Sequence, residues 1–268
     1  MPREYKLRSI FVAPKDHVLI GWDLKQAESW CVAYFANEPT MKHELAHGDI
    51  HSYTAAGIYK QPKEEMKKDK KKRYVGKQSN HMLAYRASAY RLVQTVNKES
   101  DGAVTISNKE GFEIYNVWHS LYHLDNWWAQ IEADLDIHGR MLITPYGRVR
   151  TFFETWGKEL FKQATAHLAQ STAADHFNGA VHPELGISGG YSEVYERFVV
   201  PGHVRAVNHA HDSLLVECHR SAVSAVVGPI TNLIGRPMVI NGEQFTIPVE
   251  VEIGERWNED MEEYKVNS

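Results

Sequence analysis

The chain has 268 residues, of which 43% are hydrophobic and 24% charged, and its formal net charge is -4. This composition indicates a globular protein with a buried core in one large or two modest domains. Two cysteines exclude a disulfide framework, the charged N-terminal region excludes a secretory signal, and no apolar run approaches the roughly 20 residues of a membrane span. We therefore expect a soluble intracellular protein.

The first part of the chain predicts one strand followed by helices. Val18 to Asp23 is an apolar run typical of a buried strand, and apolar spacing predicts helices over 26–36, 49–59, 72–96 and 112–135. The segment from Lys60 to Lys98 contains twelve Lys or Arg and three acidic residues, so it carries +9 while the rest of the chain carries -13. It predicts a local polyanion site, although the lysines at 67–72 fit a solvated loop equally well.

The second part predicts two hairpins and a closing strand. The turn at 145–147 places one hairpin at 143–153, and another at 205–217 carries Asp212. Helices are predicted over 159–177 and 222–234, and residues 249–253 alternate as a strand does. Strands near both ends with helices between them indicate an α+β fold, in which one sheet can bring Asp23 and Asp212 together across 189 positions.

Two carboxylates and one helix face carry the chemistry. Asp23 and Asp212 each lie at the tip of a predicted apolar strand. Four side chains recur every fourth residue and so share a slowly winding helix face: Arg73, Lys77, His81 and Tyr85. Paired carboxylates suit metal ions and helix cations suit phosphates, a combination that predicts nucleotidyl transfer.

Six short segments extend this pattern over nearly the whole chain. They are Asp23-Leu24-Lys25-Gln26-Ala27-Glu28, Asp49-Ile50-His51-Ser52, Arg73-x3-Lys77-x3-His81-x3-Tyr85, Gly147-Arg148-x-Arg150, Gln170-Ser171-Thr172-Ala173-Ala174-Asp175 and His211-Asp212. In this order they resemble the palm and fingers of family A DNA polymerases, and the run from Val249 to Trp257 is similar to that family's C-terminal strand. The resemblance implies an antiparallel palm sheet from 1–48 and 140–268, with helical fingers inserted at 49–139.

The resemblance also implies roles for individual residues. Asp23 and Asp212 match the catalytic aspartates that hold two Mg²⁺ ions, with Mn²⁺ as an alternative, assisted by the backbone carbonyl of Leu24. Residues implied to bind the incoming dNTP are Gln26, Glu28, His51, Arg73, Lys77, His81 and Tyr85. Within this set Glu28 matches the steric gate against ribonucleotides, and Tyr85 matches the tyrosine that bonds to it. Residues implied to contact primer-template DNA are Arg148, Lys162, Gln170 and His211.

Some positions depart from the family pattern. His81 replaces an aromatic ring and resembles some phage members, Arg86 replaces a glycine, and Ser213 replaces the acid that commonly follows the second aspartate. The 22 residues before Asp23 are too few for the family's thumb or exonuclease domains. We expect a second polypeptide to supply a thumb, with or without exonuclease elements, and the alternative is a compact form that binds DNA weakly. The resemblance then implies the C-terminal half of a split DNA polymerase, in the cytoplasm of a bacterium or a phage-infected cell.

Three other interpretations fit parts of the sequence. A metal-dependent hydrolase could use His209, His211 and Asp212, or the group at 47–51, but strand alternation places the two histidines on one face and Asp212 on the other. A non-catalytic DNA-binding or assembly subunit stays open. A single-subunit RNA polymerase is a nearer rival, and Glu28 favours DNA synthesis.

Overall fold

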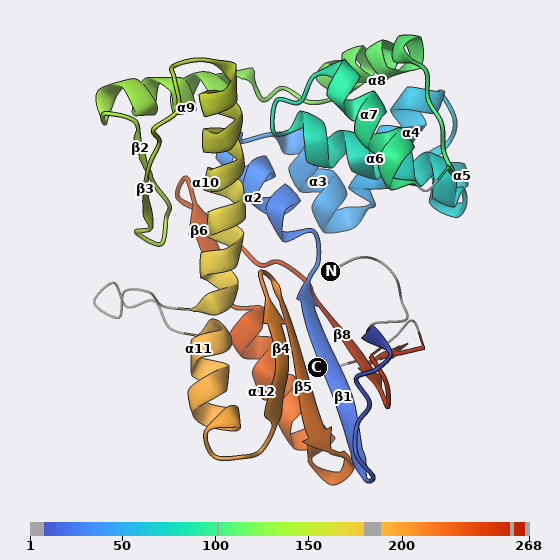
Figure 1. Cartoon of the computed structure of the whole chain (residues 1–268), viewed down its shortest axis with the longest axis vertical. Coiled ribbons are helices and arrows are strands. Elements are labelled where there is room, and N and C mark those ends of the chain that lie inside the picture. The colour runs from blue at the N-terminus through green and yellow to red at the C-terminus, as the bar shows by residue number, and fades with distance from the viewer. Residues whose placement is uncertain (1–7, 101, 180–188, 258–259, 266–268) are drawn as a thin grey trace. The chain divides into compact units, whose positions relative to one another are not determined.

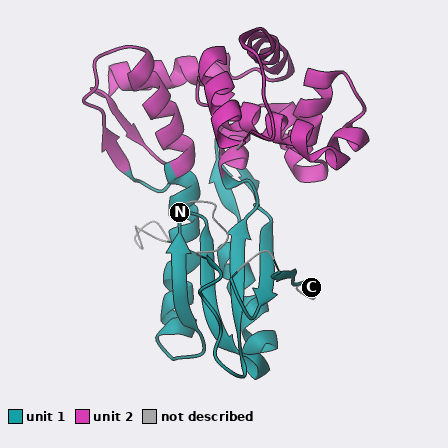
Figure 2. Ribbon diagram, turned by 45° about the vertical axis from the view of Figure 1, so that its right-hand side comes forward, with its two compact units in different colours: residues 1–27, 145–148, 171–268 teal, residues 28–144, 149–170 magenta. Residues whose placement is uncertain are grey.

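The computed structural model describes residues 8–100, 102–179, 189–257 and 260–265. The chain divides into two compact units (Figure 2). One, which we call the sheet unit, comprises 1–27, 145–148 and 171–268, and the other, the helical unit, comprises 28–144 and 149–170. Among the described residues, no helix has both the length and the apolar character needed to cross a membrane.

A five-stranded antiparallel sheet forms the centre of the sheet unit (Figure 1). Its strand order is β4-β5-β1-β8-β9. The strands are β1 (His17–Leu24), β4 (Arg205–Ala210), β5 (Ser213–His219), β8 (Val249–Gly254) and β9 (Glu262–Glu263). The register places Asp23 of β1 opposite Ser213 of β5 and Glu250 of β8. An α+β fold with an antiparallel sheet is therefore confirmed.

The two faces of this sheet differ. Helix α12 (Val223–Ile234) packs on one face, where the Trp22 indole donates a hydrogen bond to the Thr231 hydroxyl at 3.0 Å. Side chains alternate along a strand, so Asp23 lies on the other face. On that face Leu19, Leu215 and Met261 form a small apolar cluster. The sheet unit also contains α11 (Gly190–Val194), a π-helix at Tyr195–Val199, a 3₁₀ turn at Arg220–Ala222, β6 (Met238–Ile240) and β7 (Glu243–Phe245).

The helical unit consists mainly of short helices. These are α2 (Ala27–Phe35), α3 (Pro39–His47), α4 (Ile50–Tyr59), α5 (Lys63–Lys68), α6 (Lys70–Leu83), α7 (Ala89–Glu99), α8 (Asn108–Leu121) and α9 (Asp125–Ile137). A hairpin of β2 (Met141–Ile143) and β3 (Val149–Thr151) follows, and then the first part of α10 (Lys158–Asn178). Ser107 and Glu110 form a reciprocal capping box at the start of α8.

The predicted helix over 72–96 is wrong, because two helices occupy that segment. Helix α6 ends at Leu83, and Arg86 takes a left-handed conformation with φ of 62°, which a right-handed helix cannot continue through. Ser88 then starts α7 by accepting a hydrogen bond from the Arg91 amide at 3.3 Å. Tyr85 consequently lies in the turn after α6 and not on its face.

The predicted helix over 112–135 is also wrong. It is divided into α8 and α9 at Tyr122, which is extended, with φ of -132°, and fully buried. The Tyr122 hydroxyl lies 2.8 Å from the Thr54 hydroxyl, so a tertiary contact holds the chain in this extended conformation. The remaining predicted helices, hairpins and strands are present, with ends shifted by one or a few residues.

The compact units follow boundaries other than those expected for palm and fingers. The sequence predicts divisions after 48 and after 139, whereas residues 28–48 belong to the helical unit. The reason is packing: Phe35 of α2 stacks on Trp127 of α9, with ring centroids 6.1 Å apart, and Glu28 bonds to Tyr85. The assignment of palm and fingers to these segments stays a prediction.

Candidate active site

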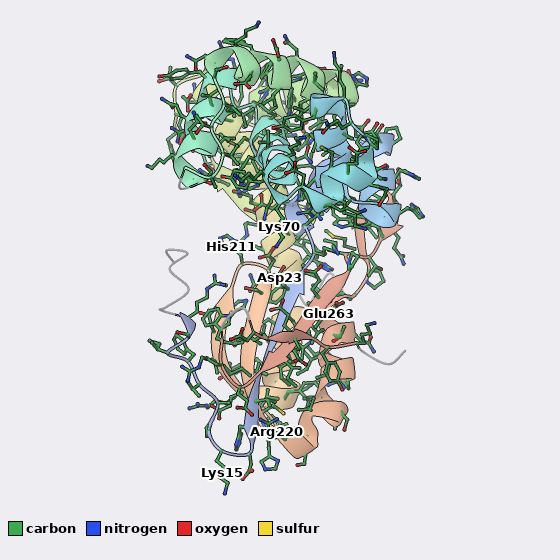
Figure 3. The ribbon with its side chains drawn as sticks, turned by 90° about the vertical axis from the view of Figure 1, so that its right-hand side faces the viewer. Lys15, Asp23, Lys70, His211, Arg220 and Glu263 are labelled. Atoms are coloured by element: carbon green, nitrogen blue, oxygen red, sulfur yellow. The ribbon has the colours of Figure 1, made fainter. Side chains whose placement is uncertain are left out.

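Asp23 and Asp212 lie at one end of the sheet. The backbone amide of Leu24 donates to the backbone carbonyl of Asp212 at 3.0 Å, which joins the end of β1 to the turn between β4 and β5. Figure 3 shows Asp23 and His211 at the same end of this sheet, away from Lys15 and Arg220. Pairing of β1 with β5 thus brings together two aspartates that are distant in sequence. Carboxylate and carbonyl oxygens are hard donors that suit Mg²⁺ or Mn²⁺, and the ligand set of Asp23, Asp212 and the Leu24 carbonyl stays a prediction.

The turn geometry corrects one expectation about His211 and Asp212. Strand β4 ends at Ala210, and His211 has a left-handed φ of 50°, so Asp212 belongs to a turn and strand alternation does not fix its direction. His209 is held in an aromatic stack, 4.1 Å from the Tyr191 ring and 5.7 Å from the Phe177 ring, and burial lowers its pKa. In the part of the chain that the structure describes, no three His, Cys, Asp or Glu side chains gather as a metal-binding group.

Two acidic residues near Asp23 were missed by the sequence reasoning. Glu250 and Glu252 of β8 lie opposite Asp23 and Gly21, and opposed residues of antiparallel strands share a face. All four line a cavity of about 430 Å³. The Glu250 carboxylate is 2.9 Å from the Lys25 ammonium, while burial and the charges of Glu250 and Glu263 raise the pKa of Glu252. The alternation at 249–253 predicts that Glu250 and Glu252 share one face of their strand. Only the register of the sheet shows that this face also carries Asp23.

In the helical unit, four residues predicted to bind nucleotide or DNA meet at Glu28. The Tyr85 hydroxyl donates to Glu28 Oε2 at 2.5 Å, Gln170 Nε2 lies 3.4 Å from the same oxygen, and His81 Nδ1 lies 3.7 Å from it. We call these four residues the gate cluster. Burial, with the charge and hydrogen bond of Glu28, raises the pKa of Tyr85 well above its usual value. The phenol therefore stays protonated and fixes one oxygen of the Glu28 carboxylate.

Arg73 is held by a residue whose role the sequence did not reveal. Arg73 Nε donates to Asp49 Oδ2 at 2.6 Å, and Nη2 donates to Oδ1 at 3.2 Å. Asp49 also caps α4 by accepting from the amides of His51 and Ser52. Burial raises the pKa of Asp49, but hydrogen bonds from Arg73 and Ser52 and the charge of Arg73 outweigh it and lower the pKa to about 2. Asp49 thus links the start of α4 to the guanidinium on α6.

This link predicts a pH-dependent loss of stability for Asp49→Asn, which retains an oxygen acceptor but removes the charge. At pH 6 the free energy of unfolding should fall by about 1 kcal/mol. A carboxylate with a lowered pKa stabilises fully above its unfolded value of about 3.9, and this contribution is lost as the pH falls through its folded value. Urea unfolding should therefore give a wild-type advantage that disappears from pH 4 towards a pH of about 2.

Ser88→Ala supplies a matched control, because it removes a neutral N-cap in the same unit. Its loss of stability should be the same at every pH. A pH-independent loss for Asp49→Asn as well would show that the charge of Asp49 contributes nothing.

The other predicted nucleotide-binding residues lie in both units. His51 and Lys77 belong to the helical unit, on α4 and α6, with His51 buried and Lys77 exposed. Gln26 belongs to the sheet unit and has a left-handed φ of 56°. Its side-chain oxygen is buried and has no hydrogen-bond partner, which leaves an acceptor to be satisfied.

The predicted DNA-binding cations are already engaged with acids. Arg148 Nε donates to the buried Asp175 carboxylate at 2.8 Å within the sheet unit, and this bond raises the pKa of Arg148. Lys162 lies 2.8 Å from Glu159 in the helical unit. Lys162 also lines a cavity of about 400 Å³ with Arg86.

Arg86 stands where the family pattern has glycine, and it adopts a left-handed conformation. Its guanidinium forms an ion pair with Glu132 and lies over two rings, 5.2 Å from the Trp128 centroid and 5.4 Å from that of Phe161. A left-handed conformation costs a non-glycine residue roughly 1–2 kcal/mol. The ion pair and the two cation–π contacts offset that cost.

Comparison with known proteins gives a family and a similar fold. The family described as DNA polymerase family A matches residues 2–259. Among solved structures, the fold is similar to that of the POL domain of Pol1 from M. smegmatis in complex with DNA primer-template and dNTP, with a TM-score of 0.73 and 19% sequence identity. The match covers 96% of this chain and 43% of that chain, so this chain spans less than half of the compared polypeptide.

Proposed function

Because the chain belongs to DNA polymerase family A, we propose that it is the catalytic core of a template-directed DNA polymerase that adds deoxynucleotides to a primer 3′ end. The observation that carries this proposal is the gate cluster, in which Glu28, His81, Tyr85 and Gln170 meet although their motifs are far apart in sequence. The similar fold of a polymerase domain in complex with DNA primer-template and dNTP supports it.

In this function the helical unit would bind the triphosphate. Arg73 and Lys77 place positive charge one helical turn apart on α6, where it can offset charge that develops on the phosphoryl group. The primer 3′ oxygen forms a bond to the α-phosphorus, and the bond to the departing pyrophosphate breaks. Asp49 holds the Arg73 guanidinium before substrate arrives, which reduces the ordering that binding requires.

In the sheet unit, Asp23 and Asp212 would hold two Mg²⁺ ions, with the Leu24 carbonyl as a further ligand. The ions, when bound, would activate the primer hydroxyl and neutralise triphosphate charge. With Ser213 in place of a second acid beside Asp212, Glu250 lies opposite Asp23, and Glu252 lies on the same face and lines the same cavity. They would add negative potential around the metal ligands.

Glu28 would select deoxyribose by crowding the sugar 2′ position, which favours DNA synthesis over the RNA polymerase alternative. Glu28→Ala should raise incorporation of ribonucleotides relative to deoxyribonucleotides by roughly 10- to 100-fold, because the shorter side chain leaves room for a hydroxyl group. Single-nucleotide kinetics with a matched dNTP and rNTP pair would measure this ratio.

Glu28→Gln is the matched control, since it keeps the size of the side chain and removes its charge. It should retain most of the discrimination against ribonucleotides. An unchanged ratio in Glu28→Ala would place sugar selection elsewhere and would reopen the RNA polymerase alternative.

Binding of the primer-template duplex is a separate part of the proposal. A second polypeptide would supply a thumb for it, with or without exonuclease elements. Two observations support this part of the proposal. The predicted DNA-binding residues Arg148 and Lys162 already pair with acids, and the chain has a net charge of -4. A polymerase that neutralises few phosphates binds DNA weakly and loses affinity steeply with salt.

We place the protein with its substrates in the cytoplasm of a bacterium or an infected cell, which cell fractionation would test.

Primer extension by the purified chain tests both parts of the proposal. The chain should extend a primer by dNTP addition at low salt and make only short products at moderate salt. No extension at any salt or metal concentration would favour the non-catalytic alternative. Long products at physiological salt from the chain alone would remove the need for a second polypeptide.

A further inference from the structure

Asn80 forms a complete set of side-chain hydrogen bonds inside the helical unit. It lies on α6, is 2% exposed and faces α4 and α8. Its Oδ1 accepts from the Thr54 hydroxyl at 2.8 Å and from the Trp118 indole at 3.0 Å. Its Nδ2 lies 3.3 Å from the Ile50 carbonyl and 3.2 Å from Nδ1 of His51. The Thr54 hydroxyl has a single proton and also lies 2.8 Å from the Ile50 carbonyl, so it shares that proton between two acceptors. Each of the four hydrogen-bonding positions of the amide thus faces a polar atom.

Chemistry fixes the orientation of this amide. The indole N–H of Trp118 can only donate, so the Asn80 atom that faces it must be the oxygen. The backbone carbonyl of Ile50 can only accept, so the atom that faces it must be the nitrogen. The two contacts exclude the flipped amide independently of each other.

The amide orientation then fixes the proton on His51. An amide nitrogen only donates, so Nδ1 of His51 must carry a lone pair, and the proton of the neutral ring must be on Nε2. The ring is also held neutral: burial lowers the pKa of His51 to about 3, and the charges of Arg73, Lys77 and His81 act in the same direction. Asp49 opposes them.

We propose that Asn80 is a positioning residue that holds His51 as a neutral imidazole with its proton on Nε2, so that the ring offers an N–H donor to the triphosphate. One part of this proposal rests on the proposed function, namely that the triphosphate is the group to which His51 donates. Arg73 and Lys77 already bring full positive charge to this part of the unit. His51 would add a directional hydrogen bond that does not change over the working pH range.

Histidine-selective ¹⁵N NMR tests the tautomer without any assay of activity. His51→Gln identifies the His51 signals among those of the 15 histidines by their loss. The wild-type protein should show the Nε2–H tautomer with no titration between about pH 5 and 8. An Nδ1–H tautomer, or a titration in that range, would overturn the proposal.

Asn80→Asp is the informative variant. One carboxylate oxygen can still accept from Trp118 and Thr54, while the other replaces the donor that faces His51 Nδ1. The proton should move to Nδ1, and the pKa of His51 should rise beside the new negative charge. Asn80→Ser, whose side chain is too short to reach the ring, should give mixed tautomers and serves if Asn80→Asp does not fold.

Thr54→Val and Tyr122→Phe are the matched controls, because they remove other hydrogen bonds of the same buried network and leave the contact between Asn80 and His51. Both should keep the Nε2–H tautomer. If either switched the tautomer as Asn80→Asp does, the effect would belong to packing and not to Asn80.

Kinetics connect the tautomer to substrate. In Asn80→Asp the KM for dNTP should rise about tenfold at pH 8, where a lone pair on Nε2 would face phosphate oxygens, and should recover as the pH falls and the ring becomes doubly protonated. The wild-type KM should lack this recovery. An unchanged KM in a variant with a switched tautomer would overturn the role assigned to His51, while absence of extension by the wild type would overturn only the proposed function.

Discussion

Replacing either Asp23 or Asp212 by alanine should reduce nucleotide incorporation by at least about 1,000-fold, equivalent to roughly 4 kcal/mol of transition-state stabilisation. Each variant removes one of the two carboxylates that would hold the metal ions. Asp23 is exposed and Asp212 is half-buried in a turn, so neither change opens the core. Single-turnover primer extension at millimolar Mg²⁺, with thermal unfolding followed in parallel, would measure the loss.

Glu263→Gln provides the control for this pair of variants. Glu263 is an exposed carboxylate on the edge strand β9 of the same sheet, so its replacement should leave incorporation within about twofold of wild type. Near-wild-type extension by the Asp23 or the Asp212 variant would refute the assignment of both as catalytic metal ligands.

The second large effect is expected for Arg73→Ala, which should lower kcat/KM for dNTP by about 100-fold. The guanidinium offers a fixed, directional positive charge, and Asp49 holds it in place. Lys77→Ala should act in the same direction. Binding of primer-template DNA, measured by fluorescence anisotropy, should change by no more than about twofold, because the charge serves the triphosphate.

Lys71→Ala is the matched control on the same helix. It removes one positive charge from α6 at an exposed position two residues from Arg73, and so from a different face. Its kcat/KM should stay near that of the wild type. A variant of Arg73 that weakened only DNA binding would show that α6 presents its cations to DNA and not to the nucleotide.

Arg86 illustrates why sequence periodicity failed in this region. The repeat from Arg73 to Tyr85 continues at helical spacing, and no glycine or proline marks an end to the helix. The left-handed turn exists because Glu132, Trp128 and Phe161 compensate an arginine there, and all three come from other helices. Breaks of this kind depend on tertiary contacts, so local propensity does not report them.

In the gate cluster, the sequence motifs assigned the residues, but only the structure shows their contacts. Glu28, Tyr85 and Gln170 were assigned to the substrate site from their motifs, but sequence spacing does not measure the 2.5 Å contact between Tyr85 and Glu28. Asp49 and Asn80 were not assigned structural roles, since a capping carboxylate and a buried amide have no distinctive spacing. Their partners, Arg73 and His51, lie 24 and 29 positions away.

The sequence alone determined the α+β class, the strand that carries Asp23, the hairpin that carries Asp212, and the residue types that suit metal ions and triphosphate. These features are local or periodic, and period-two and helical spacing record them directly. Only the tertiary structure decided the register that sets Glu250 beside Asp23, the turn that removes Tyr85 from α6, and the buried amide that fixes the proton of His51. Each depends on groups distant along the chain, whose approach is set by packing of the whole core.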